Sequence, residues 1–475
     1  MPNSRTLVMK FGGTSVGSAQ AMSYAAQIVK NAQEEWSHVV VVTSAISGVT
    51  NLLLDSAMRA AAGDVSQLRD AENQLRASHL SIAKELIPDL NKGNKIIAEV
   101  DELISVFADL CGAITLIGEA SPRTLDAVAS LGERMSVRLL AAVFEENGLN
   151  AKALDAREFI VTNTHFQNAH PELEATSRQT RSKILPLLDD GVVPVVTGYI
   201  GATPAGVVTT LGRGGSDYSA AILGAVLPAD EVWIWTDVDG VMTADPRIVP
   251  DARTLPEITY SEVSELAYFG AKVLHPKTVR PVVDAGIGLR ICNTFNPSHP
   301  GTRLVSNSQG NGTTGNGYIV KAVTAIRRQR LVTIEGRGML GIPGVAARAF
   351  GAVASTGTSV PLISQASSEQ SICFAVPTDA CESVLFELGR IFAEELEEND
   401  VDRIWATDDI SIITVVGAKM RSTPGVAGKV FGKLGEKNVN VLAIAQGSSE
   451  VSISMVVESD RTEDAVKALH DLIIK

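Results

Sequence analysis

The chain has 475 residues, of which 45% are hydrophobic and 20% charged, a composition typical of a globular protein with two to four domains. Its formal net charge of -13 disfavours nucleic-acid binding, because nucleic-acid-binding proteins normally carry a basic surface. No apolar run approaches the roughly 20 residues of a membrane-spanning helix, and the N-terminus lacks the features of a signal peptide. We therefore expect a soluble protein with neither a nucleic-acid nor a membrane partner.

The cysteines and histidines indicate neither a disulfide framework nor a metal site. The sequence contains four cysteines and seven histidines, with no Cys-x-x-Cys pair and no metal-ligand spacing. Free thiols in apolar surroundings are typical of a reducing compartment. The expected location is cytoplasmic, with no metal held by the protein alone.

The first 305 residues alternate short apolar runs with longer amphipathic ones. Continuous Val/Ile-rich runs predict strands covered on both faces, as in a parallel sheet between helices. The interval 63–110 is helix-rich and predicts a helical excursion beside the sheet. The predicted strands lie within 6–9, 38–43, 192–196, 206–210, 231–235 and 288–292, and helices are predicted over 18–33 and from Asn51. The sequence thus predicts an α/β domain with a mainly parallel sheet sandwiched by helices.

Residues 306–317, SNSQGNGTTGNG, contain no apolar side chain and predict a flexible linker between domains. An internal repeat follows, in which Gly344 corresponds to Gly425 and Gln365 to Gln446, each 81 residues further on. Each copy has the pattern of a βαββ unit of the ferredoxin-like type. The predicted domains are a catalytic domain over 1–305, the linker, and repeat domains over 318–400 and 401–475, with possible strand exchange or insertion between the last two.

Four loops rich in glycine and hydroxyl side chains follow predicted strands. In open α/β sheets, ligands bind beyond the carboxyl ends of the strands, so these loops are expected to converge on one site. The loops are VMKFGGTSVG at 8–17, TSAISGVTN at 43–51, TTLGRGGSD at 209–217 and TDVDGVMTADPR at 236–247.

In the first loop, Gly12 and Gly13 are expected to offer backbone N–H groups to an anion, and Lys10 to reach a phosphoryl group in transfer. The alternative is a surface lysine beside a tight turn. No G-x-x-x-x-G-K-[ST] motif occurs, so a P-loop fold is not supported.

In the third loop, Arg213 stands between Gly212 and Gly214, where little side-chain bulk surrounds it. This arrangement favours a bidentate grip on a carboxylate or phosphate. Ser216 and Asp217 are predicted to cap the helix that follows. A glycine-rich loop followed by a helix cap explains these two residues but not the arginine.

The remaining candidates are weaker taken singly. Thr236 and Asp237 end a strand and fit a nucleotide-side role, with a plain turn as the alternative. Their Asp-x-Asp-Gly pattern lacks the other ligands of a calcium loop. Glu133 is expected at a helix start, and His275 is more typical of a structural histidine than of a catalyst.

Taken together, VMKFGGTSVG, SAISGVTN, SLGERMS, TTLGRGGSDYSA, WTDVDGVMTADPR and FGAKVLHP resemble the aspartate kinases, members of the amino acid kinase family. The resemblance extends over essentially the whole chain, because the repeat looks like the paired ACT domains that these enzymes carry. It implies transfer of the ATP γ-phosphate to the β-carboxylate of L-aspartate, giving 4-phospho-L-aspartate and ADP. This reaction opens the biosynthesis of lysine, threonine and methionine.

The resemblance also implies roles for individual residues. Lys10 and Asp217 would be catalytic, with Lys10 also on the phosphates, and Mg²⁺ would be bound mainly through ATP. Aspartate would be held by Thr50, Glu133, Arg213 and Ser216. The ATP site would be lined by Phe11, Gly12, Gly13, Thr236, Asp237, Met242, Arg247, Lys272 and Val273.

Two of these positions need comment. Many relatives have tyrosine where this chain has Met242, so only a backbone contact to ATP is expected there. The nucleophile is a carboxylate with an ordinary pKa of about 3.9, already ionised at neutral pH, so no general base is required. Asp217 is therefore expected to orient Lys10 or a Mg²⁺-bound water, and catalysis to depend on positioning and charge neutralisation.

Paired ACT domains imply regulation by an amino acid. The segments SQASSE and AQGSSE resemble threonine-sensitive family members, with Gln365 first and Gln446 second as the residues expected to contact threonine rather than lysine. ACT domains commonly pair between subunits, so a homodimer or homotetramer is expected. The chain stops at Lys475 without the homoserine dehydrogenase domain that some relatives carry, so a monofunctional enzyme is expected.

Two alternatives remain open from the sequence. Another amino acid kinase, acting on glutamate, carbamate or a nucleotide, would share the glycine loops and the sheet. A non-catalytic amino acid sensor with a decayed kinase domain would not need Lys10, Arg213 and Asp217.

Overall fold

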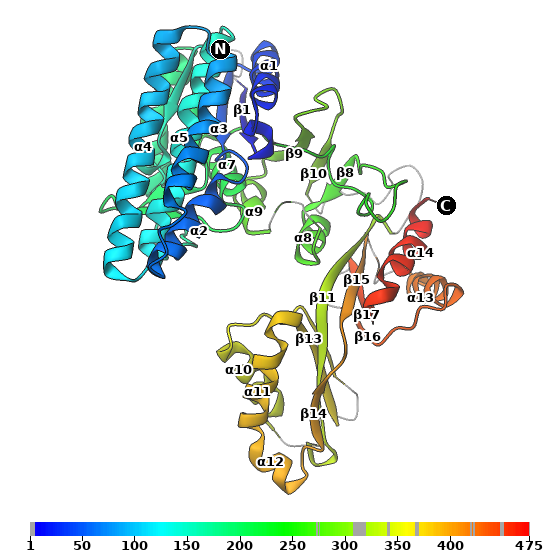
Figure 1. Ribbon diagram of the computed structural model, residues 1–475. Helices are drawn as coiled ribbons and strands as arrows, with labels where there is room; N and C mark the ends of the chain where they lie inside the picture. Colours follow the sequence, from blue (N-terminus) through cyan, green and yellow to red (C-terminus); the bar gives the residue numbers. More distant parts are fainter. Residues whose placement is uncertain are drawn as a thin grey trace. The chain divides into compact units, whose positions relative to one another are not determined.

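The computed structural model describes residues 5–271, 274, 276–306, 320–339, 343–365, 370–418, 420, 423–446 and 451–474 (Figure 1). The chain forms two compact units. The N-terminal unit comprises Met1–Val241, Pro256–Tyr260 and Leu274–Ser306, and the C-terminal unit comprises Met242–Leu255, Ser261–Val273 and Asn307–Lys475.

The N-terminal unit contains an eight-stranded sheet in the order β3-β4-β2-β1-β7-β9-β10-β8. All neighbouring pairs are parallel except β9 and β10. The sheet strands are β1 (Thr6–Phe11), β2 (His38–Thr43), β3 (Ala151–Leu154), β4 (Val193–Thr197), β7 (Glu231–Thr236), β8 (Glu257–Thr259), β9 (Gly288–Asn293) and β10 (Thr302–Val305).

Helices cover the central strands of the sheet, so the residues of these strands are buried. All six residues of β1 and the last five of β2 are buried, which explains the unbroken Val/Ile runs of the sequence. The long helices α3, α4 and α5 lie side by side, as Figure 1 shows in cyan and blue. The helices are α1 (Ala19–Glu35), α2 (Val49–Ala61), α3 (Leu68–Leu86), α4 (Leu90–Ile117), α5 (Pro122–Glu146), α6 (Leu173–Asp189), α7 (Gly215–Val226) and α9 (Pro276–Asp284).

Two local predictions for this unit are wrong, and one predicted strand forms but lies outside the main sheet. The strand predicted over 206–210 is β6 (Val208–Thr210), which pairs with β5 (Ile200–Ala202) in a separate antiparallel hairpin. Glu133 lies in the middle of α5, not at a helix start. The N-cap of α7 is Gly214, so Ser216 and Asp217 belong to its first turn and cap nothing.

The C-terminal unit is organised around the long strand β11 (Ala322–Glu335). Its first half pairs with β15, and its second half pairs with β13 and β14. The register shifts between Ile326 and Gln329, where Arg328 has a left-handed φ of 57°. The other strands are β12 (Leu362–Gln365), β13 (Ser371–Pro377), β14 (Arg403–Ala406), β15 (Ile410–Val416), β16 (Ala443–Ala445) and β17 (Ser452–Glu458).

Each half of this unit packs helices on its own strands. Phe374 and Leu388 belong to one buried cluster, and Ile413 and Leu469 belong to another. One strand therefore serves both repeats, since β11 completes the sheet of the second before it enters the first. The helices are α8 (Tyr260–Tyr268, which begins in the N-terminal unit), α10 (Val345–Ser355), α11 (Cys381–Ile391), α12 (Ala393–Glu398), α13 (Val426–Glu436) and α14 (Thr462–Ile474).

Within the described ranges, no helix has both the length and the apolar character needed to cross a membrane. Most of the predicted linker, residues 307–317, and the predicted nucleotide-side residues Lys272 and Val273 lie outside the described residues.

Candidate active site

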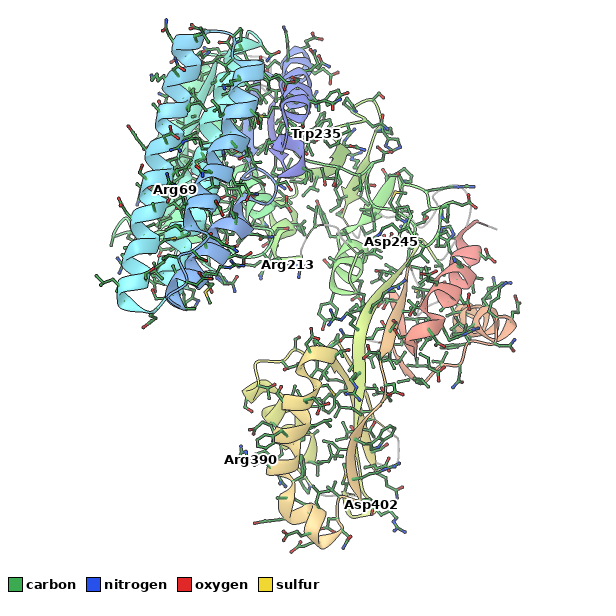
Figure 2. All side chains as sticks on the ribbon, viewed as in Figure 1. Arg69, Arg213, Trp235, Asp245, Arg390 and Asp402 are labelled. Atoms are coloured by element: carbon green, nitrogen blue, oxygen red, sulfur yellow. The ribbon has the colours of Figure 1, made fainter. Side chains whose placement is uncertain are left out.

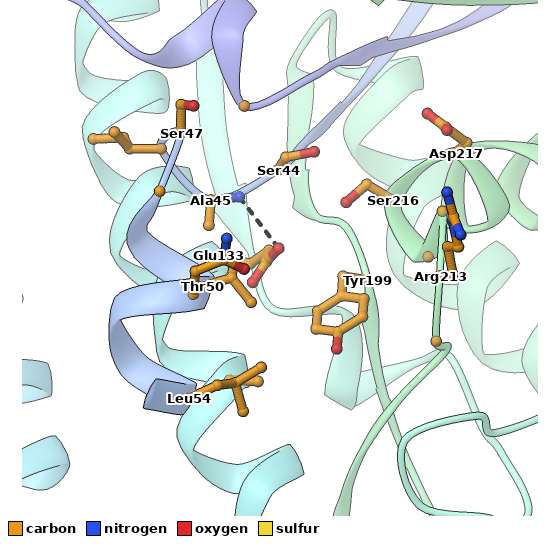
Figure 3. Close-up of a pocket in the computed structure, with 18 of the residues that line it drawn as sticks. Ser44, Ala45, Ser47, Thr50, Leu54, Glu133, Tyr199, Arg213, Ser216 and Asp217 are labelled. Atoms are coloured by element: carbon orange, nitrogen blue, oxygen red, sulfur yellow. Dashed lines mark hydrogen bonds between the residues drawn. The ribbon is translucent and has the colours of Figure 1, made fainter. Parts of the chain in front are cut away.

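A cavity of about 610 Å³ opens beside the carboxyl ends of β1 and β2 (Figure 3). The loops after β1, β2 and β6 and one face of α5 surround it. The cavity brings together seven predicted site residues: Lys10, Gly13, Thr50, Glu133, Arg213, Ser216 and Asp217.

Lys10 and Asp217 form an ion pair on the wall of this cavity. Lys10 Nζ lies 2.6 Å from Asp217 Oδ1, and the two side chains are only 11% and 19% exposed. Lys10 comes from β1 and Asp217 from the first turn of α7. Partial burial strengthens the attraction between the two charges and fixes the ammonium in place.

Glu133 is a buried carboxylate with one open oxygen. Its Oε1 accepts a hydrogen bond of 3.2 Å from the Ala45 N–H (dashed in Figure 3). Its Oε2 is buried and has no hydrogen-bond partner among the described residues. Burial raises the pKa of Glu133 to about 8. An unpartnered buried carboxyl group of this kind suits a cationic ligand, which would restore the ionised form.

Arg213 lies across the cavity from Glu133, on the opposite side of the Tyr199 ring (Figure 3). The residue is exposed and lies at the edge of the N-terminal unit (Figure 2). Its side chain makes no hydrogen bond or ion pair to any residue that the structure describes. The next residue, Gly214, has a left-handed φ of 69°, which a residue with a side chain rarely adopts. The glycine therefore allows the sharp turn that leads from Arg213 into α7.

Two hydroxyl groups complete the polar lining. Thr50 is the second residue of α2, which begins after the left-handed Gly48. Ser216 is buried in the first turn of α7, beside Arg213. Both side chains lie where a small polar ligand in the cavity could meet them.

The first loop offers fewer free backbone N–H groups to an anion than the sequence predicts. The Gly12 N–H donates to the Trp235 carbonyl at 3.1 Å, so it is engaged within the fold. A Cβ at Gly13 would lie 3.0 Å from the Ala45 carbonyl oxygen, so glycine is needed where the first two loops touch. The Phe11 side chain is fully buried and stacks on Trp235, which leaves only its backbone for a ligand.

The cavity does not include the other predicted nucleotide-side residues. Thr236 ends β7 in the N-terminal unit and Asp237 follows it, and the Thr236 hydroxyl donates to the Asp237 carboxylate at 3.2 Å. Met242 and Arg247 belong to the C-terminal unit. Arg247 pairs with Asp245 at 2.6 Å and is 77% exposed, and this arginine holds the pKa of Asp245 below its ordinary value.

Sequence reasoning missed six residues that line the cavity: the polar residues Asp126, Gln167 and Tyr199 and the apolar residues Leu54, Leu125 and Ala129. Asp126 precedes Glu133 by two helical turns on α5, a spacing that could have indicated a shared face once the helix was recognised. Tyr199 has a left-handed φ of 67°, and its local sequence does not predict that conformation.

In the C-terminal unit, Gln365 ends β12 and Gln446 follows β16, and both residues are exposed. The strands β12 and β16 lie next to each other. Leu362 and Ala443, from these strands, share one buried cluster.

Comparison with known proteins agrees with this architecture. The family model described as "Amino acid kinase family" matches residues 5–293, and an ACT domain model matches residues 332–392 and 413–472. The chain belongs to the amino acid kinase family, among its aspartokinases with two ACT domains. Strand β11 begins between the kinase match and the first ACT match and ends within the first ACT match.

Aspartokinases of plants are similar to this chain over nearly its whole length. Bifunctional aspartokinase/homoserine dehydrogenase 2 of Arabidopsis thaliana is 38% identical over 463 residues, which are 98% of this chain and 50% of that protein. Aspartokinase 3 of the same plant is 36% identical over 473 residues, 98% of this chain and 81% of that protein. The chain thus spans about half the length of the bifunctional relatives it matches.

Solved structures agree with the sequence comparison. Aspartokinase III of E. coli, in complex with aspartate and ADP, has a TM-score of 0.80 and 31% identity, covering 99% of this chain and 100% of that one. The same enzyme in complex with lysine and aspartate also gives a TM-score of 0.80, at 32% identity.

Proposed function

We propose that this aspartokinase-family protein transfers the γ-phosphate of ATP to the β-carboxylate of L-aspartate, releasing 4-phospho-L-aspartate and ADP. The observation that carries the proposal is the cavity, which holds the Lys10–Asp217 pair together with the carboxyl group of Glu133 and the guanidinium of Arg213; Glu133 Oε2 and Arg213 have no hydrogen-bond partner among the described residues. The similar E. coli enzyme was solved with aspartate and ADP.

The acceptor fits the charges of the cavity. The α-ammonium of aspartate goes to Glu133, whose open Oε2 calls for a cation. Arg213 grips a carboxylate, because a guanidinium offers two parallel N–H groups to two oxygens. Thr50 and Ser216 add hydroxyl contacts. An amino acid with a second carboxylate thus meets Glu133 and Arg213 with complementary charges and keeps one carboxylate for the reaction.

The chemical step needs no base, because the attacking β-carboxylate is ionised at neutral pH. Lys10 neutralises charge on the phosphoryl group as it moves from ADP to the carboxylate oxygen. Asp217 orients Lys10, which their 2.6 Å ion pair supports. Rate acceleration then comes from alignment of the two substrates and from charge neutralisation.

The nucleotide is bound by backbone groups of Phe11 and Gly13. It is also contacted by the remaining predicted residues: Gly12, Thr236, Asp237, Met242, Arg247, Lys272 and Val273. No cluster of three or more His, Cys, Asp or Glu side chains within the described ranges could hold a metal ion. Mg²⁺ would bind mainly through the ATP phosphates, where it would add charge neutralisation, and Asp217 is the carboxylate beside Lys10.

The two ACT domains bind threonine and inhibit the enzyme, with Gln365 as the first contact and Gln446 as the second. The adjacency of β12 and β16 supports a shared effector site near these two glutamines. The E. coli relative was solved with lysine, so lysine is the rival effector. The active form is a homodimer or homotetramer joined through ACT domains, and the enzyme acts in the cytoplasm at the start of lysine, threonine and methionine biosynthesis.

A coupled ADP-release assay tests the activity. Purified protein with ATP and Mg²⁺ is given aspartate, glutamate, carbamate or a nucleoside monophosphate. Release of ADP with aspartate supports the proposal, and preference for another acceptor points to a different amino acid kinase. Repeating the assay with millimolar threonine and lysine decides the effector; a response to lysine alone contradicts the threonine assignment.

A further inference from the structure

Tyr199 lies in a further loop at the carboxyl edge of the sheet, between β4 and β5. It has no part in the chemistry above, although its ring stands between Glu133 and Arg213 in the cavity (Figure 3). Its φ of 67° is left-handed, which costs free energy for a residue with a side chain. The surrounding structure must therefore hold this conformation, and the contacts that hold it indicate what the residue does.

The backbone of Tyr199 is bonded to both ends of the loop that carries Arg213. Its carbonyl oxygen accepts the Leu211 N–H at 2.9 Å, before the arginine. Its N–H donates at 2.9 Å to Ser219 Oγ, and the same hydroxyl donates at 3.0 Å to the Gly215 carbonyl, after the arginine. Leu211 and Gly215, the two ends of the loop, are thus tied to one residue.

The Tyr199 ring packs directly on the first turn of α7. A Cβ built at Gly215 would lie 2.5 Å from Tyr199 Cδ2, so the ring occupies the space that a side chain there would need. The preceding residue, Gly198, lies equally close to the same turn, because its Cβ would lie 2.8 Å from Ser216 Cβ. The loop after β4 and the start of α7 therefore meet at contact distance.

This contact matters because α7 begins without a side-chain cap. Its N-cap is Gly214, which has no side chain to accept hydrogen bonds from the first N–H groups of the helix. The first turn nevertheless carries Asp217, whose Oδ1 lies 2.6 Å from Lys10 Nζ. Packing by Tyr199 from outside the helix supplies the support that a cap would otherwise give.

We propose that Tyr199 is a positioning residue that holds the Arg213 loop and the first turn of α7 together. The proposal rests on the proposed function, because it takes Asp217 as the residue that orients Lys10 and Arg213 as a residue that binds a carboxylate of aspartate. The contact with the first turn of α7 keeps Asp217 in place and so affects the rate. The bond to the start of the loop keeps Arg213 in place and so affects aspartate binding.

A double-mutant cycle of Tyr199 and Gly215 tests the contact. Gly215→Ala places a methyl group where the ring stands. We expect kcat with aspartate to fall about tenfold and the KM for aspartate to rise about fivefold, with the KM for ATP within about threefold of wild type. Tyr199→Ala removes the ring and should have effects of similar size. In the Tyr199→Ala background, Gly215→Ala should lower kcat/KM by less than about threefold, because the clash is gone.

Two further variants separate positioning from general stability. Gly224→Ala makes a matched clash in the same helix, since a Cβ there would lie 2.6 Å from Val232 Cγ2, and Gly224 does not line the cavity. It is expected to lower the Tm, to keep kcat and KM at their wild-type values, and to have the same effect in the Tyr199→Ala background. Tyr199→Phe restores the ring and should bring kcat and KM back to within about threefold of wild type.

Three results would overturn the positioning role. The first is an equal loss of kcat/KM in Gly215→Ala and Gly224→Ala. The second is an effect of Gly215→Ala that is undiminished in the Tyr199→Ala background, and the third is a Tyr199→Phe variant as impaired as Tyr199→Ala. If Tyr199→Ala does not fold, the two glycine variants and Tyr199→Phe carry the test.

The proposed function can fail separately. If wild-type protein releases no ADP with aspartate, that function is wrong, and crystal structures of the two glycine variants then test the positioning role alone. A Lys10 Nζ–Asp217 Oδ1 distance that lengthens beyond about 3.5 Å in Gly215→Ala but not in Gly224→Ala supports the role. The wild-type distance of 2.6 Å in both variants overturns it.

Discussion

Two ion pairs of the same length lie in very different surroundings. Lys10–Asp217 and Arg247–Asp245 both span 2.6 Å. The side chains of the first are 11% and 19% exposed, and those of the second are 77% and 34% exposed. Water screens the second pair and leaves it free to exchange partners, whereas the first is held in the low-dielectric wall of a cavity.

The difference indicates what each pair does. A buried lysine and carboxylate lose hydration, and each then depends on the other to stay charged in a fixed place. In the N-terminal unit that fixed charge faces the cavity where phosphoryl transfer is proposed. In the C-terminal unit, Arg247 can leave Asp245 for a phosphate at little cost. Breaking the first pair should therefore affect the rate, and breaking the second should affect only nucleotide binding.

The largest effect is expected for Lys10→Ala. Removing a preorganised charge at the site of phosphoryl transfer should lower kcat by about a hundredfold or more, measured by coupled ADP release. Lys30→Ala, which removes an exposed lysine of α1, is the control and should keep wild-type turnover. Turnover of Lys10→Ala within tenfold of wild type would contradict the role of the buried pair.

Asp217→Asn sharpens the same comparison. It keeps the shape of the pair and removes the charge that orients Lys10. We expect kcat to fall by about tenfold to a hundredfold, less than for Lys10→Ala. Near-normal turnover of Asp217→Asn beside an inactive Lys10→Ala would show that the orienting role is wrong.

Glu133→Gln should weaken aspartate binding with a distinctive pH dependence. The pKa of Glu133 is about 8, so the free carboxyl group is protonated at neutral pH and must ionise to take an ammonium. The wild-type KM for aspartate should therefore fall as pH rises from about 6.5 to about 8, by at most about tenfold per unit. The Gln variant should have a KM that is higher, by about tenfold or more at pH 8, and flat with pH.

The same group makes a prediction for stability. Its folded-state pKa of about 8 lies above the ordinary value of 4.5, so the protonated form favours folding. This contribution is complete below the ordinary pKa and is lost as pH rises through the folded one. The Tm of wild type should fall relative to that of Glu133→Gln across this window; parallel Tm curves for the two proteins would contradict the burial of an unpaired carboxyl group.

Effector mutations should separate regulation from catalysis. Gln365→Ala should raise the threonine concentration for half-inhibition by about tenfold or more. Loss of the glutamine contact weakens threonine binding, and inhibition depends on that binding. Gln446→Ala should raise it less, by about threefold. Turnover without threonine should stay at the wild-type level in both. Unchanged inhibition in both variants would remove these glutamines from the effector site.

The smallest effect is expected for Arg247→Ala. The KM for ATP should rise by about threefold to tenfold through loss of one phosphate contact, with kcat nearly unchanged. The Tm should stay within about 1 °C of wild type, because the Arg247–Asp245 pair is exposed. A loss of kcat as large as that of Asp217→Asn would erase the distinction between the two pairs.

Local patterns predicted the elements with continuous burial and missed the short or irregular ones. The apolar runs of β1 and β2 are correctly predicted as parallel strands, because all of β1 and the last five residues of β2 are buried. β6 has three residues and sits in a hairpin, so its sequence could not show that it leaves the main sheet. The Gly12 N–H was predicted to face an anion, but the carbonyl that engages it belongs to Trp235, far along the chain.

The site shows the same limit. Glycine loops and single charged residues are local signals, and they led to Lys10, Arg213 and Asp217 in one cavity. Gln167 and Thr210, which donate hydrogen bonds to Asp126, lie 41 and 84 residues away from it, so no local pattern could reveal this contact. Buried polar networks of this kind appear only when the loops are placed in space.

The most direct test of the account is ADP release by the wild-type protein with ATP and Mg²⁺ and each of aspartate and glutamate as acceptor. The proposed function predicts turnover with aspartate and at least about tenfold lower kcat/KM with glutamate. No ADP release above the acceptor-free rate with aspartate, or equal kcat/KM for the two acids, would contradict it.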